Sequence, residues 1–124
     1  MSGTNFLIDT NIVIYLTQGK LNTAAFAEKG SILYISSITY IEALGYPFQN
    51  QSDENEINEL CEKFEHLFIT EKVEKQTIFI RKMNKIKLPD AIIAATAMVH
   101  NLTLVTRNCD DFKNIQGLKM INPL

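Results

Sequence analysis

The chain has 124 residues, of which 46% are hydrophobic and 21% charged, and its formal net charge is −2. This length and composition predict a single globular domain, spanning residues 1–124, that can bury a substantial apolar core without crosslinks. The negative charge argues against a protein that holds nucleic acid by bulk positive charge. It does not exclude a nuclease, because a bound divalent cation can supply positive charge locally.

The cysteine and hydropathy patterns bear on the cellular compartment. Cys61 and Cys109 form no CxxC pair, so the sequence favours neither a disulfide framework nor a zinc site. No apolar run reaches the roughly 18 residues of a membrane span. Residues 1–5 lack the basic segment of a signal peptide, and Asp9 interrupts the apolar residues that follow. We therefore expect a cytoplasmic protein without a membrane anchor.

Short apolar runs alternate with longer helical patterns in the first half of the chain. The first run, at 6–8, is followed directly by Asp9, Thr10 and Asn11, three residues that favour the start of a helix. The predicted elements of this half, in chain order, are strand 6–8, helix 12–16, strand 32–35, helix 39–44, a polar loop at 49–54, helix 54–67 with a capping box from Asp53 to Glu56, and strand 68–70.

The second half continues the alternation. Its predicted elements are helix 71–85, helix 91–100, strand 102–105, a short helix or turn at 110–115 and strand 118–121. Pro89 suits the first helical position, and Asn101 suits a left-handed stop. Residues 91–99 are apolar almost all round, so this helix is expected to be central and buried. The whole pattern predicts an α/β fold in which helices cover both faces of a mostly parallel sheet.

Four carboxylates fall where predicted strands end or the following helices begin: Asp9, Glu42, Asp90 and Asp111. Right-handed crossovers bring the strand-to-helix loops to one edge of the sheet, where open α/β sheets bind ligands. Two carboxylates about 4 Å apart repel by roughly 4 kcal/mol at an effective dielectric constant of 20, so such a cluster needs cations or protons. With no His or Cys nearby, all-oxygen ligands favour Mg²⁺ or Mn²⁺, which can activate a water for phosphodiester hydrolysis.

Each acid also has a purely structural explanation. Asp9 could cap the first helix, and Glu42 could complete a capping box with Thr39, a role that we weigh evenly against catalysis. Asp90 could favour the helix dipole, and Asp111 could be a turn residue. Taken singly, these explanations equal or outweigh a catalytic role. Four acids from four separate segments of one edge nevertheless favour a shared site, with Asp9 and Asp90 at its surface.

These residues resemble PIN-domain proteins, and among them the VapC-type toxins of bacterial toxin–antitoxin pairs. The resemblance covers nearly the whole chain and depends on the order of these blocks: Leu7 to Asn11, Ile35 to Glu42, Leu88 to Ala97, Leu104 to Asn108, Asp111-Phe112 and Ile121 to Pro123. It implies a three-layer αβα sandwich and an Mg²⁺- or Mn²⁺-dependent endoribonuclease acting on tRNA or other structured RNA. It also implies a homodimer and inhibition by a cognate antitoxin.

The resemblance assigns Asp9, Glu42 and Asp90 to three acids of the family's catalytic, metal-binding centre. Some members carry the fourth acid where this chain has Asn108, and others carry it directly before the Phe, where this chain has Asp111. We assign Asp111 as the fourth catalytic and metal-binding acid, with Asn108 as a polar helper that adds no charge. One or two bound ions are both compatible with this set.

Several neighbouring residues have supporting roles in this interpretation. Thr10 and Thr106 are expected to bond the carboxylates from behind, although Thr106 could equally be an ordinary strand-end residue. Arg107, next to the acids, is the candidate for binding the RNA backbone. The basic residues between 72 and 87 are better explained as a solvated helix face. His66 and His100 are expected to pack or to lie at the surface, since a metal-bound water needs no histidine.

Two other classes of function fit less well. A catalytically silent PIN-like module that binds RNA or a protein partner is the main alternative, but it would not need so costly an acidic cluster. A phosphoryl-transfer receiver needs a lysine where the chain has Arg107. A haloacid-type phosphatase needs Asp-x-Asp, whereas the chain has Asp9-Thr10-Asn11. The sequence therefore favours the metal-dependent ribonuclease.

Overall fold

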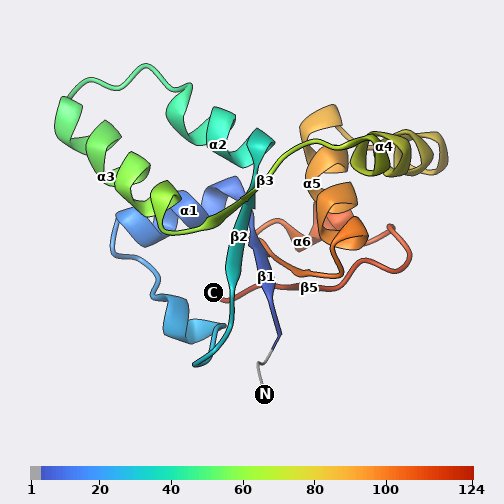
Figure 1. The fold of residues 1–124 in the computed structure, drawn as a ribbon, viewed down its shortest axis with the longest axis horizontal. Helices are drawn as coiled ribbons and strands as arrows, with labels where there is room; N and C mark the ends of the chain where they lie inside the picture. Colours follow the sequence, from blue (N-terminus) through green and yellow to red (C-terminus); the bar gives the residue numbers. More distant parts are fainter. Residues whose placement is uncertain (1–3) are drawn as a thin grey trace.

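The computed structural model describes residues 4–124, in which a five-stranded sheet lies between two layers of helices (Figure 1). The strands are β1 (Phe6–Ile8), β2 (Leu33–Ser36), β3 (Glu65–Leu67), β4 (Thr103–Val105) and β5 (Met120–Ile121). Their order is β3-β2-β1-β4-β5, and all four pairings are parallel. The predicted α/β fold, an αβα sandwich with a mostly parallel sheet, is confirmed.

The helices divide between the two faces of the sheet. Helices α1 (Thr10–Thr17), α2 (Ser37–Leu44) and α3 (Gln51–Glu62) pack together on one face, and α4 (Glu71–Met83) and α5 (Leu88–Val99) pack on the other (Figure 1). A 3-10 turn, η1 (Thr23–Ala25), and the short α6 (Cys109–Phe112) lie in the connections. No helix among residues 4–124 has both the length and the apolar character that a bilayer span requires.

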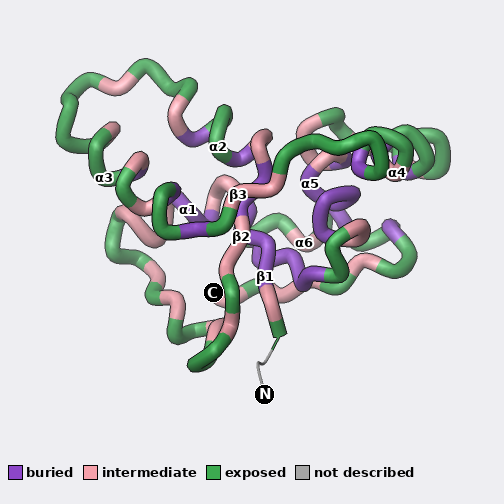
Figure 2. The backbone as a smooth tube through the Cα atoms, in the orientation of Figure 1, coloured by how far each residue is buried: buried purple, intermediate pink, exposed green. Residues whose placement is uncertain are grey.

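The central strand β1 is buried on both faces because successive side chains of a strand point in opposite directions. Leu7 packs in the cluster formed with α4 and α5, whereas Phe6 and Ile8 pack in the cluster formed with α1 and α3. Buried residues accordingly concentrate along the sheet and the inner helix surfaces (Figure 2). The carboxyl end of β1 is therefore supported by packed helices on both faces of the sheet.

Helix α5 is the predicted buried helix, and its interior position is confirmed. Ala91 and the residues from Ile93 to Ala97 are all buried, and their small side chains allow close packing against α4 and the sheet. Asn101, with φ 54°, provides the predicted left-handed stop. Pro89 lies one residue later in the helix than predicted, because the helix begins at Leu88 after the cap residue Lys87.

The segment around α3 differs from the prediction. The side chain of Asn50 accepts a hydrogen bond from Asp53 N at 3.0 Å, so the helix begins at Gln51 and the predicted Asp53 capping box is wrong. The exposed first turn carries no apolar residue that would mark it as helical. The helix ends at Glu62, and the strand predicted at 68–70 is instead β3, Glu65–Leu67. Phe64 and Leu67 continue the three-residue spacing of the helix, which is why the pattern overran its end.

Candidate active site

Asp9 lies where β1 ends and α1 begins, at the carboxyl edge of the sheet. Its carboxylate accepts hydrogen bonds from Thr10 N at 2.8 Å, Thr106 Oγ1 at 2.7 Å and Asn11 Nδ2 at 3.2 Å. Asp9 is 5% exposed, so the expectation that it lies at the surface is wrong: the residue is enclosed by the groups that bond it. Asp9 caps α1 through the bond from Thr10 N. The bonds from Asn11 and Thr106 are additional to this capping role.

The electrostatic state of Asp9 reflects this enclosure. Burial raises the pKa of the Asp9 carboxyl above its ordinary value, and the charge of Glu42 adds to the rise. The hydrogen bonds from Thr106, Thr10 and Asn11 oppose it, because they favour the ionised form. A nearby cation would favour the ionised form further.

Two threonines contact the carboxylates, at the positions that the sequence suggested. Thr106 is fully buried, donates to Asp9 Oδ2, and accepts from Asn108 N at 3.0 Å. The Thr10 hydroxyl lies 2.7 Å from Glu42 Oε1 and 3.2 Å from Thr39 Oγ1. A hydroxyl has one proton, so Thr39 donates to Thr10 and Thr10 donates to Glu42. Each threonine thus orients one carboxylate.

Glu42 is not part of a capping box. The N-cap of α2 is Ser36, whose Oγ accepts a hydrogen bond from Thr39 N at 3.2 Å. Thr39 is therefore inside the helix, and the predicted box from Thr39 to Glu42 is wrong. Glu42 is exposed, lies further along α2, and is held by Thr10 from the neighbouring helix α1. The capping-box explanation of Glu42, which we weighed evenly against catalysis, is thereby removed.

Asp90 and Asp111 complete the acidic edge. Burial raises the pKa of Asp90, and the charges of Asp9, Asp111 and Glu42 raise it further, against a smaller opposing effect of Lys87. The other three predicted acids are therefore within electrostatic reach of Asp90. Within residues 4–124, neither Asp90 nor Asp111 accepts a side-chain hydrogen bond. Within the described residues, the carboxylates of Asp90 and Asp111 are therefore not held in place by hydrogen bonds from other side chains.

The residues around Asp111 come from the loop after β4. Asn108 is the exposed N-cap residue of α6, but its side chain makes no capping bond. Asp111 lies in α6, where its backbone N–H donates to Asn108 O at 3.0 Å. Both candidates for the fourth position thus lie at this edge, and only Asp111 adds a charge that acts on Asp90. The assignment of Asp111 remains a prediction.

The donor set suits a hard cation. Among the described residues, no three His, Cys, Asp or Glu side chains converge within direct reach of one ion. A closed zinc site is thus a poor fit. Mg²⁺ usually retains several waters and binds through one or two carboxylates, and Mn²⁺ shares this preference for oxygen ligands. A hydrated ion fits this edge, where Asp9, Glu42, Asp90 and Asp111 would hold it, one or two of them directly and the others through its waters.

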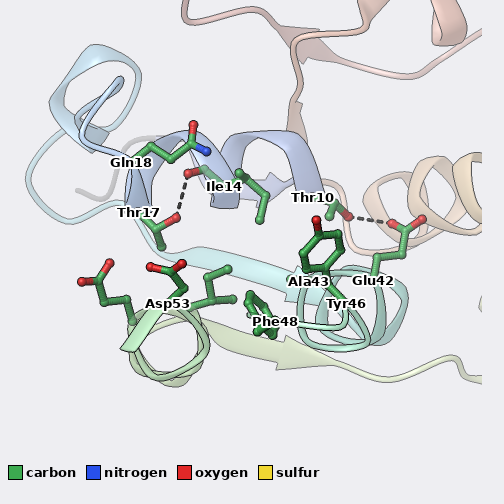
Figure 3. Close-up of a pocket in the computed structure, with 11 residues that line it drawn as sticks. Thr10, Ile14, Thr17, Gln18, Glu42, Ala43, Tyr46, Phe48 and Asp53 are labelled. Carbon is green, nitrogen blue, oxygen red and sulfur yellow. Dashed lines mark hydrogen bonds between the residues drawn. The ribbon is translucent and has the colours of Figure 1, made fainter. Parts of the chain in front are cut away.

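A groove adjoins the acids on the side of α1, α2 and α3 (Figure 3). Its volume is about 540 Å³, and Thr10 and Glu42 lie at one end of it, joined by their hydrogen bond. The apolar part of its wall is formed by Ile14, Ala43, Tyr46, Phe48 and Ile57. Asp53 and Glu56 add negative charge, and no basic residue occurs among the described side chains that line the groove.

Sequence reasoning missed three contributors to this edge. Asn11 bonds Asp9 and also accepts from Arg107 N at 3.1 Å, Thr39 supports Thr10, and Tyr15 accepts a hydrogen bond from the guanidinium of Arg107. The helical spacing of Asn11 and Tyr15, four residues apart, placed both on one face and was the available signal. Their partner Arg107 is too distant in sequence for a local pattern to reveal.

The protein is thus an α/β protein, a parallel αβα sandwich that carries four acids at the carboxyl edge of its sheet. The chain belongs to the PIN domain family, whose model matches residues 6–118. The family predicted from the sequence is confirmed.

Individual relatives agree with this assignment. The chain is 32% identical to Ribonuclease VapC1 of Rickettsia felis over 93% of both chains. A solved toxin–antitoxin complex from Klebsiella pneumoniae contains a chain with 34% identity and a TM-score of 0.78, covering 95% of this chain and 97% of that one. The fold also matches a chain in the structure of VapBC2 from Rickettsia felis bound to a promoter DNA fragment, with a TM-score of 0.82, 22% identity, and coverage of 96% and 98%.

Proposed function

We propose that the chain is a divalent-metal-dependent endoribonuclease and the toxin of a toxin–antitoxin pair. The observation that carries the proposal is the convergence of Asp9, Glu42, Asp90 and Asp111 on one electrostatically coupled edge of a PIN domain. The name of the relative Ribonuclease VapC1 supports RNA as the substrate class, and tRNA or another structured RNA is the substrate that we propose.

The chain's own residues would orient the reaction. Thr106 and Asn11 hold Asp9, and Thr10 holds Glu42, before any ligand arrives. Mg²⁺ or Mn²⁺, when bound, would polarise a phosphate and lower the pKa of a water. Asp90 and Asp111 add negative charge that raises the affinity for the cation. No histidine base is required, and His66 is already occupied by a contact with Ser37 Oγ at 3.1 Å.

The groove beside Glu42 is the proposed docking site of the antitoxin. Its apolar wall and acidic side chains suit an amphipathic segment with basic residues. A segment bound there would cover one end of the acidic edge. The toxin–antitoxin complex from Klebsiella pneumoniae supports a protein partner of this kind. An RNA substrate and the free thiols of Cys61 and Cys109 agree with a cytoplasmic site of action.

A homodimer is also proposed, from exposed apolar side chains near the same edge. Ile41 of α2 is 60% exposed, and Phe68, directly after β3, is 68% exposed. Side chains of this size and exposure on two adjacent elements are a favourable contact surface for a second copy. Sedimentation of the purified protein would test this part of the proposal separately from catalysis.

The nuclease is tested by incubating the purified protein with total tRNA and a second structured RNA in Mg²⁺, Mn²⁺ or chelator. Asp9→Asn and Asp90→Asn serve as variants, with circular dichroism and calorimetric metal binding as controls for folding and the site. We expect discrete cleavage that requires metal and disappears in both variants. Equal cleavage by wild type and variants would identify a contaminant. Metal binding without cleavage of either RNA would contradict the proposed substrate, and the absence of both would favour a silent binding module.

A further inference from the structure

Arg107 follows β4 at the carboxyl edge and is fixed at three points. Its backbone N–H donates to Asn11 Oδ1 at 3.1 Å, and its carbonyl accepts from Asn122 Nδ2 at 3.4 Å. Its guanidinium donates from Nη1 to the hydroxyl of Tyr15 and lies 5.7 Å from the centre of that ring. The first two contacts hold the backbone, and the side chain is directed by Tyr15 alone.

Within residues 4–124, the side chain of Arg107 forms no ion pair with any of the four acids. A guanidinium beside a group of carboxylates ordinarily forms a bidentate ion pair with one of them. Among residues 4–124, however, the only ion pair joins Lys75 to Glu71. The positive charge that lowers the pKa of Asp90 comes from Lys87, and Arg107 makes no such contribution to Asp9 or Asp90. The contact with Tyr15 is a hydrogen bond and not an ion pair, so no carboxylate among the described residues is paired with Arg107.

Arg107 also lines a second cavity. This cavity has a volume of about 390 Å³, and it is lined by Arg107, Asn108, Cys109, Asp110, Asp111 and Asn122. Arg107 therefore shares this cavity with two carboxylates, Asp110 and Asp111, the second of which is one of the four acids. A guanidinium has five N–H donors, and Tyr15 uses one of them. The remaining donors are available to a phosphate, which the planar guanidinium binds well.

We propose that Arg107 binds a backbone phosphate next to the scissile one, and that Tyr15 is a positioning residue that holds the guanidinium off the carboxylates for this purpose. The inference rests on the proposed function, because it supplies a cation for the RNA backbone at the acidic edge of a chain whose net charge is −2. Arg107 and Tyr15 together are called the phosphate arm. Asn11 connects this arm to the proposed metal centre, because its side chain bonds both Asp9 and the backbone of Arg107.

The test compares Arg107→Met, Arg107→Lys and Tyr15→Phe with the wild type. Tyr15→Phe keeps the ring and removes only the hydroxyl that holds Arg107. Arg81→Met removes an exposed cation from α4, on the opposite face of the sheet from α1, and serves as the matched charge control. The readouts are anisotropy of fluorescein-labelled total tRNA in Ca²⁺ at several salt concentrations, kcat and KM of cleavage in Mg²⁺, calorimetric Mg²⁺ affinity, and the melting temperature.

Loss of one phosphate contact should weaken tRNA binding by Arg107→Met about tenfold and reduce the slope of log K against log salt by about one. Arg107→Lys should recover the slope and only part of the affinity. Tyr15→Phe should raise KM roughly threefold with kcat nearly unchanged, because a guanidinium free to turn loses one charge-assisted contact part of the time. Mg²⁺ affinity and melting temperature should be unchanged in Arg107→Met.

Four results would overturn parts of this inference. A wild-type salt slope in Arg107→Met, or an equal effect of Arg81→Met, would remove the phosphate arm. Loss of melting temperature in Tyr15→Phe without a change in KM would make Tyr15 a packing residue only. Absence of tRNA binding by the wild type would also overturn the arm. Absence of cleavage with binding and its arginine dependence intact would contradict the nuclease function but leave the arm standing.

Discussion

The two halves of the acidic edge are built differently. Asp9 and Glu42 are each held by a threonine hydroxyl at 2.7 Å, and Asp9 has two further donors. Asp90 and Asp111, within the described residues, have no side-chain hydrogen bond, and the pKa of Asp90 is raised first by burial and then by the charges of the other three acids. The held half has its geometry before a ligand binds, whereas the free half contributes charge and can move towards a cation.

The difference follows from where the residues lie in the chain. Asp9 and Glu42 are placed by α1 and α2, beside the central strands β1 and β2, and Thr106 reaches Asp9 from the end of β4. Asp90 follows the connection between α4 and α5, and Asp111 belongs to the four-residue helix α6. Substitutions in the held half should therefore disturb orientation and folding, while those in the free half should change charge with little effect on packing.

The largest effect outside the acids is expected for Thr106→Val. The valine keeps the shape but removes the donor to Asp9 and the acceptor for Asn108 N. Loss of a residue that orients a metal ligand typically reduces activity or metal affinity 10- to 100-fold, and a buried group left unpaired costs about 1–3 kcal/mol. The measurements are metal-dependent RNA cleavage and urea unfolding.

Thr103→Val is the matched control for this substitution. Thr103 is also on β4 and 8% exposed, but its hydroxyl makes no hydrogen bond within the described residues. We expect near-wild-type activity and stability. If Thr103→Val lost as much activity and stability as Thr106→Val, strand packing and not the contact with Asp9 would account for the effect of Thr106→Val.

A smaller effect is expected for Thr10→Val. This change removes the donor to Glu42, whose carboxylate is exposed and can exchange the lost bond for water. The free energy of unfolding should fall by about 0.5–1.5 kcal/mol, the usual net value of one hydrogen bond. Activity should fall less than in Thr106→Val. A larger loss in Thr10→Val would reverse the ranking of the two held acids.

The smallest effect, and one of opposite sign, is expected for Asp90→Asn without metal. The asparagine removes the cost of burying a charge and the repulsion from the other acids, and it loses no side-chain hydrogen bond within the described residues, so the variant should be more stable. Because Asp90 is only half-buried, solvent screening limits the gain to about 1 kcal/mol or less. Excess Mg²⁺ should reverse the order, since wild type gains about 2.7 kcal/mol at 100 times its dissociation constant.

The pH dependence of the same variant follows from the pKa of Asp90. That pKa is raised in the folded protein above its ordinary value of 3.8, so the folded state binds the proton more tightly than the unfolded state. Metal-free wild type is therefore less stable than Asp90→Asn by the full amount at pH values above the pKa of Asp90 in the folded protein. This difference disappears as the pH falls from that pKa towards 3.8, because Asp90 becomes protonated. A deficit that grows on acidification would contradict this assignment. Thermal melts across this pH range provide the measurement.

Sequence reasoning succeeded where local signals were unambiguous and failed where a distant contact decided the outcome. The cap residues after strand 6–8 were sufficient to predict the start of α1, and the apolar residues before Asn101 were sufficient to predict the buried helix α5. Ser36 and Thr39 are both good cap residues, and the end of β2 selected Ser36, which the sequence did not reveal. The burial of Asp9 depends on Thr106, and the direction of Arg107 depends on Tyr15, across separations of 97 and 92 residues.

The central claim is that the four acids form one cation site with a held half and a free half. A crystal structure of the protein with Mn²⁺, analysed by anomalous scattering, tests it most directly. We predict a peak beside Asp9, with the Asp9 carboxylate unmoved on Thr106 and with Asp90 or Asp111 turned towards the ion. No peak at the edge under saturating Mn²⁺, or a peak that contacts none of Asp9, Glu42, Asp90 and Asp111, would contradict the account.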